Sequence, residues 1–171
     1  MFDACYPNVP SVDFYARAKI IAQRAEVESA KGRFDVAVHS IDEAVRLMGL
    51  AKEKTASAKG NILKVVKFDE KSYEALSHYY RAQQFMSEGR YFLAKREART
   101  SYSRLRLLRG NYRKGLVNTR LEKSQRLLEE AEDRFNNCEH NSRDLQDMLG
   151  DAVSRENYQR AAEIKKMLAG K

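Results

Sequence analysis

Proline, cysteine and tryptophan are scarce in this sequence. Both prolines, Pro7 and Pro10, lie in the first ten of its 171 residues, and tryptophan is absent. Because proline interrupts helices, the rest of the chain is free to form long helices without a break. Two cysteines are too few for a disulfide framework, which predicts a reducing, cytoplasmic location.

Long apolar runs are missing as well. No stretch approaches the roughly 18 consecutive apolar residues that a membrane-spanning helix needs, so we expect no membrane insertion. The opening segment MFDACYPNVPS has no basic region followed by an apolar one, so we expect no secretory signal. We predict a flexible N-terminus over 1–10 and a single helical domain over 11–171.

Motifs for catalysis and metal binding are also absent from the sequence. It has no Gly-rich phosphate loop, no nucleophile elbow and no His-Glu-x-x-His motif. The three histidines are scattered, and Cys138 with His140 supplies too few ligands for zinc. We therefore predict that the protein is not an enzyme and has no cofactor or metal.

The sequence is rich in apolar residues at helical spacing. Steps of three and four residues, bounded by Gly and capping residues, predict helices at about 12–31, 34–58, 70–88, 91–109, 113–137, 143–154 and 157–169. Ser11, Asp69 and Ser142 are the expected capping residues of three of them. The run ILKVVKF at 62–68 fits either a short strand or one more helical turn. Because no partner strand is evident, we expect a turn or irregular structure there.

These helices predict an all-α fold. About seven helices would pack as antiparallel hairpins, in a bundle or a short irregular solenoid. Possible sub-units are a hairpin at 11–60, a basic hairpin with a long helix at 69–137, and a last hairpin at 142–169.

Three of the expected helix–helix corners have similar sequences. They read Gly32-Arg33-Phe34-Asp35-Val36-Ala37, Gly89-Arg90-Tyr91-Phe92-Leu93-Ala94 and Glu156-Asn157-Tyr158-Gln159-Arg160-Ala161. A small or polar residue turns the chain, an aromatic residue fills the corner, and an alanine lets the two helices approach. An ordinary helical hairpin explains much of this pattern.

The first two corners also resemble the tetratricopeptide hairpin, over 25–44 and 82–101. The motif wants small, turn, aromatic and large residues in a fixed order, and these positions match: Ala25, Gly32, Phe34, Ala37, Ile41 and Ala44, then Ala82, Phe85, Gly89, Tyr91, Ala94 and Ser101. The corners are not separated by the repeat period of about 34 residues, and the usual proline is missing. The resemblance implies isolated hairpins rather than a regular superhelix.

The third corner resembles a UVR motif over 144–168. That helical hairpin occurs in bacterial excinuclease subunits and in Clp-protease regulators. The matching positions are Leu145, Met148, Ala152, Val153, Tyr158, Ala161, Ala162, Ile164, Lys165 and Leu168. Lys165-Lys166 stands near the motif's usual Arg-Asp pair. The resemblance implies a docking element for a protein partner, with Tyr158, Ala161, Ala162, Lys165 and Lys166 as its candidate residues.

Positive charge is concentrated in one segment. The whole chain has 32 Lys+Arg against 24 Asp+Glu, whereas residues 90–126 have twelve against two. Nine of the twelve are arginine, which binds phosphate with two parallel hydrogen bonds. The candidate polyanion-binding residues are Lys95, Arg99, Arg106, Arg109, Arg113, Lys114 and Arg120. Nucleic acid, an acidic protein, the chain's own acidic segment 127–171 and a membrane surface all remain open as partners.

These observations favour a non-catalytic interaction or adaptor protein. It would dock a protein partner through helical hairpins and present the basic face at 90–126 to a polyanion. The alternative is a nucleic-acid-binding protein that uses the Arg- and Tyr-rich 90–126 segment as its main site. A homo-oligomer stays open.

Overall fold

The computed structural model describes residues 10–56, 61–108, 114–137 and 140–170. These residues form seven α-helices and no strand, which confirms the predicted all-α class. The helices are α1 (Pro10–Ala30), α2 (Phe34–Thr55), α3 (Asn61–Ser87), α4 (Tyr91–Leu108), α5 (Lys114–Asn137), α6 (Ser142–Ser154) and α7 (Tyr158–Ala169). The predicted flexible segment 1–10 lies almost wholly outside the described residues.

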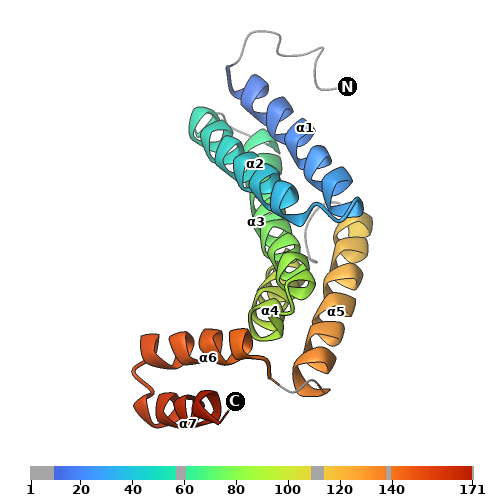
Figure 1. The fold of residues 1–171 in the computed structure, drawn as a ribbon. Coiled ribbons are helices and arrows are strands. Elements are labelled where there is room, and N and C mark those ends of the chain that lie inside the picture. The colour runs from blue at the N-terminus through green and yellow to red at the C-terminus, as the bar shows by residue number, and fades with distance from the viewer. Residues whose placement is uncertain (1–9, 57–60, 109–113, 138–139, 171) are drawn as a thin grey trace.

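The first five helices pack mainly on their neighbours in sequence. Each of α1 to α4 packs on the helix that follows it, and α3 also touches both α1 and α5. In Figure 1, α1 and α5 both lie on the same side of α3. The α6–α7 hairpin turns sideways at the end of α5, and there α6 contacts α4. This arrangement is a short irregular stack of helical hairpins with a side arm.

Small residues bring the helices close together. Alanines are frequent in the core between α1 and α2, beside larger residues such as Ile41 and Met48. Three of the alanines on α2 recur every seven residues, and the buried alanines of the two helices are Ala18, Ala22, Ala25, Ala37, Ala44 and Ala51. Along α4 the predicted stripe Ala94, Ala98, Ser101, Leu105 and Leu108 is buried throughout. The sequence periodicity therefore identified the faces that form the core.

The prediction of a turn or irregular structure at 62–68 is wrong. The segment forms the first turns of α3, which begins at Asn61, and Asp69 lies inside that helix instead of capping it. Val66 packs in the α1–α2 core, and Phe68 packs with Leu108 and Val117. These contacts with distant residues outweigh the modest helix propensity of a segment rich in β-branched residues.

Two other predicted capping residues also lie inside helices. α1 begins at Pro10, which places Ser11 in its first turn. α6 begins at Ser142, and the residue before it, Asn141, is the cap. The Asn141 side chain accepts a hydrogen bond of 2.8 Å from the backbone N–H of Asp144.

The three corners share one backbone geometry. Gly32 and Gly89 have φ of 75° and 70°, and Glu156 has φ of 57°, so all three are left-handed. In each corner the next N–H donates to the carbonyl five residues back: Arg33 to Glu28, Arg90 to Phe85 and Asn157 to Ala152, at 2.8–3.0 Å. This is the Schellman pattern that ends helices. The predicted repetition of the corner is confirmed for the backbone.

The aromatic residue does not fill all three corners. Phe34 and Tyr91 are partly buried, whereas Tyr158 is 68% exposed. At the third corner Asn157 closes the helix start instead, because its side chain accepts a hydrogen bond of 3.1 Å from the N–H of Arg160.

Candidate functional site

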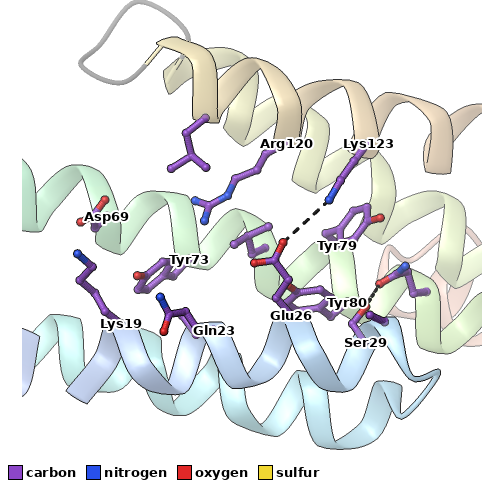
Figure 2. A pocket seen from close by; sticks show the side chains of 15 residues that line it. Lys19, Gln23, Glu26, Ser29, Asp69, Tyr73, Tyr79, Tyr80, Arg120 and Lys123 are labelled. Atoms are coloured by element: carbon purple, nitrogen blue, oxygen red, sulfur yellow. Dashed lines mark hydrogen bonds and ion pairs between the residues drawn. The ribbon is translucent and has the colours of Figure 1, made fainter. Parts of the chain in front are cut away.

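A groove runs between α1, α3 and α5, and we call it the tyrosine groove. α3 forms its floor, while α1 and α5 form its two walls (Figure 2). The space is about 510 Å³. Its walls carry Lys19, Gln23 and Glu26 from α1 and Leu116, Arg120 and Lys123 from α5, and its floor carries Asp69, Tyr73, Leu76, Tyr79, Tyr80 and Gln83.

Hydrogen bonds tie this groove together across the helices. Tyr15 donates to Asp69 Oδ2 at 2.6 Å, and Ser29 donates to Gln83 Oε1 at 2.8 Å, which links α1 to α3 at two levels. On the other wall the guanidinium of Arg120 donates to Ser72 Oγ at 2.6 Å. The two walls approach each other where Lys123 Nζ lies 4.0 Å from Glu26 Oε1.

Two tyrosines of the floor, Tyr79 and Tyr80, have a raised pKa. Burial raises the pKa of Tyr80, and the nearby carboxylate of Glu26 raises it further. Burial also raises the pKa of Tyr79, with Glu130 as the second cause. Tyr79 is partly exposed, whereas Tyr73 and Tyr80 are 6% and 4% exposed and pack in the core.

The described lining of the groove contains no His or Cys, and its one hydroxyl outside the phenols, that of Ser29, is bonded to Gln83. Across the described part of the chain, no group of three or more His, Cys, Asp and Glu residues is placed to hold a metal ion. The arrangement is able to bind and position a ligand.

The predicted polyanion residues are divided between different surfaces. Lys95 and Arg99 lie on α4, and Arg106 is exposed two to three turns further along that helix. Arg120 lies in the tyrosine groove instead. Arg109 and Arg113 fall outside the described residues, and Lys114 begins α5 without a described side chain. The structure therefore does not gather the seven residues on one face.

Many basic side chains of 90–126 contact carboxylates of the same chain. Arg90 is bonded to Asp147 and Arg99 to Glu132, both from the acidic segment 127–171. Lys95 instead lies over the ring of Phe135, with Nζ 4.8 Å from its centroid. Internal pairing, one of the interpretations left open by the sequence, accounts for part of this charge.

Two neighbouring hollows lie beside these arginines. The α3–α4 hollow, about 520 Å³, is lined by Lys64, Lys67, Phe68, Lys71, Glu74, Arg104, Leu107 and Leu108. The α4–α6 hollow, about 530 Å³, is lined by Phe92, Lys95, Arg96, Arg99, Thr100, Ser103, Arg104, Leu107, Phe135, Asp151 and Arg155. Arg104 and Leu107 line both, so the two hollows adjoin each other.

The predicted docking residues of the C-terminal hairpin are mostly exposed. Tyr158, Ala162, Lys165 and Lys166 lie on the surface of α7, whereas Ala161 is buried against α6. Tyr158, Ala162 and Lys165 follow at steps of four and three, so they share one side of the helix. Among the described elements α7 packs on α6, which leaves this side open.

Three polar side chains attach the α6–α7 hairpin to the second corner. Two of them lie on α6, and the third belongs to Asn141, the capping residue of that helix. Asn141 donates to the carbonyl of Gly89 at 2.7 Å, and Asp144 accepts from the N–H of Phe92 at 3.0 Å. Asp147 accepts two hydrogen bonds from the Arg90 guanidinium, at 2.9 and 2.8 Å. The three residues are spaced one helical turn apart, so one face of α6 contacts the corner.

No family model, curated protein or solved structure matches this chain. The tetratricopeptide and UVR resemblances therefore stay predictions from the sequence. Within the described residues, no helix is both long and apolar enough to cross a membrane.

Sequence reasoning missed the tyrosine groove. Tyr73 and Tyr80 are seven residues apart, so a single face of one helix was detectable. Such spacing is equally typical of core residues. Nothing in the sequence indicated that α1 and α5, about 100 residues apart in the chain, flank the same face of α3.

Proposed function

We propose that the protein is a non-catalytic interaction protein that binds a segment of a protein partner in the tyrosine groove. The groove supports this because it combines a tyrosine-rich floor, on which Tyr79 is partly exposed, with two charged walls, all from separate helices. Tyrosine supplies contact area with little loss of conformational entropy, and for this reason it is frequent in protein-binding sites. With two cysteines in the chain, we propose a reducing, cytoplasmic place of action.

The chemistry of the walls indicates the kind of segment that fits. Lys19 and Arg120 bring positive charge from opposite sides, while Glu26 contributes a negative one beside Lys123. Leu116 is 41% exposed at the start of α5 and offers an apolar contact at the edge of the groove. A segment with an acidic residue and an apolar residue would satisfy both features.

A selection of peptides from a random library tests this proposal. The full chain is the target, and selected peptides are then measured by fluorescence anisotropy on two variants. Gln23→Trp fills the groove, because Gln23 is an exposed residue of its wall. Val27→Trp is the matched control, since Val27 is 50% exposed on the same helix and does not line the groove.

We expect the selected peptides to bind the Val27→Trp variant as they bind the wild type. The Gln23→Trp variant should lose at least about tenfold in affinity, because a bulky side chain occupies the ligand's place. Equal binding to all three proteins would show that the peptides recognise another surface.

A further inference from the structure

Three lysines form a row on the face of α3 that borders α4. Lys64, Lys67 and Lys71 follow at steps of three and four residues, so they lie on one side of the helix. All three are exposed and line the α3–α4 hollow. None forms an ion pair with a described carboxylate, in contrast to most arginines of α4. Lys64 and Lys67 lie in the segment 62–68, for which the sequence predicted irregular structure, and Lys71 lies in the helix predicted at about 70–88.

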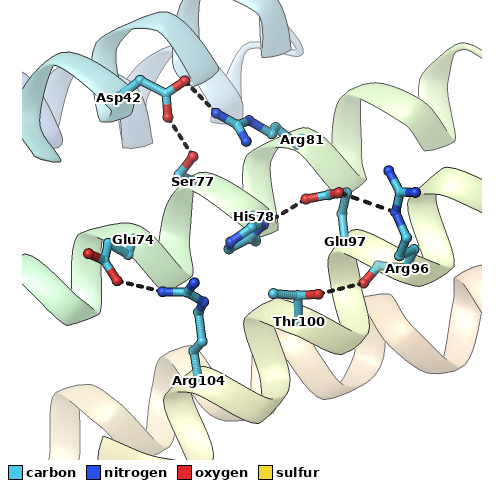
Figure 3. Close-up of polar contacts among 9 residues, drawn as sticks. All are labelled: Asp42, Glu74, Ser77, His78, Arg81, Arg96, Glu97, Thr100 and Arg104. Atoms are coloured by element: carbon cyan, nitrogen blue, oxygen red, sulfur yellow. Dashed lines mark hydrogen bonds and ion pairs between the residues drawn. The ribbon is translucent and has the colours of Figure 1, made fainter. Parts of the chain in front are cut away.

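The same hollow has one carboxylate, and that carboxylate is already neutralised. Glu74 accepts from the Arg104 guanidinium at 2.5 Å across the two helices (Figure 3). The remaining charge of the hollow is therefore that of the three lysines. Their ammonium groups are flexible, hydrated point charges of the kind that contact phosphate without fixed geometry.

The rest of the hollow is apolar. Phe68 and Leu108 form its inner side, and Leu107 is 82% exposed at its edge. No Ser, Thr, Asn, Gln, His or Tyr lines this hollow among the described residues. A protein partner would bring backbone and side-chain polar groups that need neutral hydrogen-bonding partners. A nucleic-acid strand needs cations for its phosphates and carbon surface for its sugars and bases.

The positive surface continues beyond α4. Arg104 and Leu107 also line the α4–α6 hollow, where Lys95, Arg96, Arg99 and Arg155 are further cations and Arg99 is paired with Glu132. Its carboxylate, Asp151, lies 3.5 Å from Arg96 and 3.0 Å from Arg155. The two hollows together form a basic track from α3 across α4 to the end of α6.

We propose that this basic track binds a single-stranded nucleic acid through its phosphates, with Lys64, Lys67 and Lys71 as the main contacts. The interaction is independent of base sequence, because cations and apolar carbon read no base edges. Leu107 contacts sugars or bases beside the lysine row. The proposal does not depend on the tyrosine groove, since Arg120 of that groove is not part of the track.

Fluorescence anisotropy of the full chain with labelled RNA and DNA strands of about 20 nucleotides tests the proposal. The wild type should bind either strand with an affinity that falls linearly in log salt. Replacing Lys64, Lys67 and Lys71 together by Gln should reduce the magnitude of that slope by about 2, because each phosphate contact contributes about 0.7 for single strands.

The matched control neutralises three exposed cations away from the track, Arg24, Lys165 and Lys166, by the same change to Gln. Its slope should equal that of the wild type. Equal losses in the two triple variants would overturn the proposal, because net charge alone would then explain the binding. Circular dichroism and melting confirm that each variant is folded.

Two further measurements separate nucleic acid from an acidic protein. Leu107→Ala should weaken nucleic-acid binding several-fold without changing the salt slope, because it removes carbon surface and no charge. Polyglutamate of matched charge should compete poorly. Equal competition by polyglutamate would assign the track to an acidic protein partner and overturn the proposal. The groove variant Gln23→Trp should bind nucleic acid as the wild type does, whether or not it binds peptides.

Discussion

The first and second corners have the same backbone and different partners. Both place a left-handed glycine before an arginine and begin the next helix at an aromatic residue. In the first corner Arg33 pairs with Glu28 of its own hairpin. In the second corner the position of Glu28 is taken by Phe85, whose ring lies 4.9 Å from the Arg90 guanidinium. Arg90 lies 3.4 Å from Glu88 of its own corner and pairs more closely, at 2.8 Å, with Asp147 of α6.

This difference shows how one residue decides whether a corner is closed or becomes an attachment point. Glu28 provides Arg33 with an ion-pair partner from the same hairpin, so the first corner needs no carboxylate from another part of the chain. An aromatic residue at that position leaves the guanidinium of Arg90 available for a carboxylate from elsewhere in the chain. The two corners also differ at the start of the helix that follows them. At the start of α4, Asp144 of α6 accepts a hydrogen bond from the N–H of Phe92. At the start of α2, the capping residue Arg33 forms no side-chain cap.

The largest expected difference between the two corners is in the stability lost when the arginine of each corner is replaced by alanine. Arg90→Ala leaves the mostly buried Asp147 without its cation, so the free energy of unfolding should fall by about 2–3 kcal/mol. Arg33→Ala should cost about 1 kcal/mol or less, because Arg33 is exposed and Lys31 still lies 3.5 Å from Glu28. Urea denaturation measures both. Equal costs would mean that the α6 attachment adds nothing to the second corner.

The next effect concerns the start of the helix after each corner. Asp144→Ala removes a buried acceptor from the first turn of α4, which should cost about 1–2 kcal/mol. Asp35→Ala, in the first turn of α2, should cost about 0.5 kcal/mol, because its exposed carboxylate acts through the helix dipole. Asp144→Asn serves as a control that keeps an acceptor oxygen. If Asp35→Ala proved the more costly change, the cap assigned to Asp144 would be wrong.

The third corner sharpens the comparison because it has Glu156 where the other two have glycine. A left-handed conformation is unfavourable for a residue with a side chain. We expect Glu156→Gly to raise the stability of the α6–α7 hairpin by about 0.5–1 kcal/mol, and Gly32→Ala to lower stability by about 1 kcal/mol. Hydrogen exchange of the α7 amides detects the first change and thermal melting the second. A loss of protection in Glu156→Gly would contradict the prediction.

The smallest expected effects are on the pH dependence of folding stability, where Asp144 and Glu97 should contribute with opposite signs. Burial raises the pKa of Asp144, and the neighbouring Asp147 adds to the shift, against the lowering effects of the Phe92 N–H and His140. Folded Asp144 therefore holds its proton to a higher pH than the unfolded chain does. Its contribution to stability decreases as pH rises from about 3.8 through the raised pKa.

Glu97, on α4, provides the contrast. Burial by itself would raise the pKa of Glu97. The hydrogen bond and charge of His78, 2.7 Å away, lower that pKa and outweigh the burial. Its contribution is present above about pH 4.5 and is lost as pH falls through the lowered pKa. Unfolding measured from about pH 3 to 6 on Asp144→Asn and Glu97→Gln should show slopes of opposite sign relative to the wild type. Slopes of the same sign would contradict the pKa assignments.

Helix positions and core faces were predictable because they follow from local spacing. The stripe from Ala94 to Leu108 and the glycine corners depend on residues a few positions apart. The segment 62–68 was not predictable in this way. Its helical form depends on contacts of Val66 and Phe68 with residues more than ten positions away.

The binding surfaces were harder to predict for the same reason. The charge of 90–126 was evident, but its partners Glu74, Glu132 and Asp147 lie 30 to 57 residues from the arginines that they neutralise. The sequence therefore left open whether the basic face at 90–126 meets an external polyanion or the chain's own acidic segment 127–171. Lys64 and Lys67 lay in a segment that was not predicted to be helical, so the row that they form with Lys71 could not be recognised.

The attachment of α6 to the second corner also has a consequence for the order of folding. Its hydrogen bonds join residues 52 to 57 positions apart, whereas each helical hairpin pairs adjacent segments. Closing a long loop costs entropy that local hairpins avoid, so local pairing precedes docking of the side arm. We expect Arg90→Ala to accelerate unfolding and to leave the refolding rate almost unchanged, because its ion pair forms after the transition state.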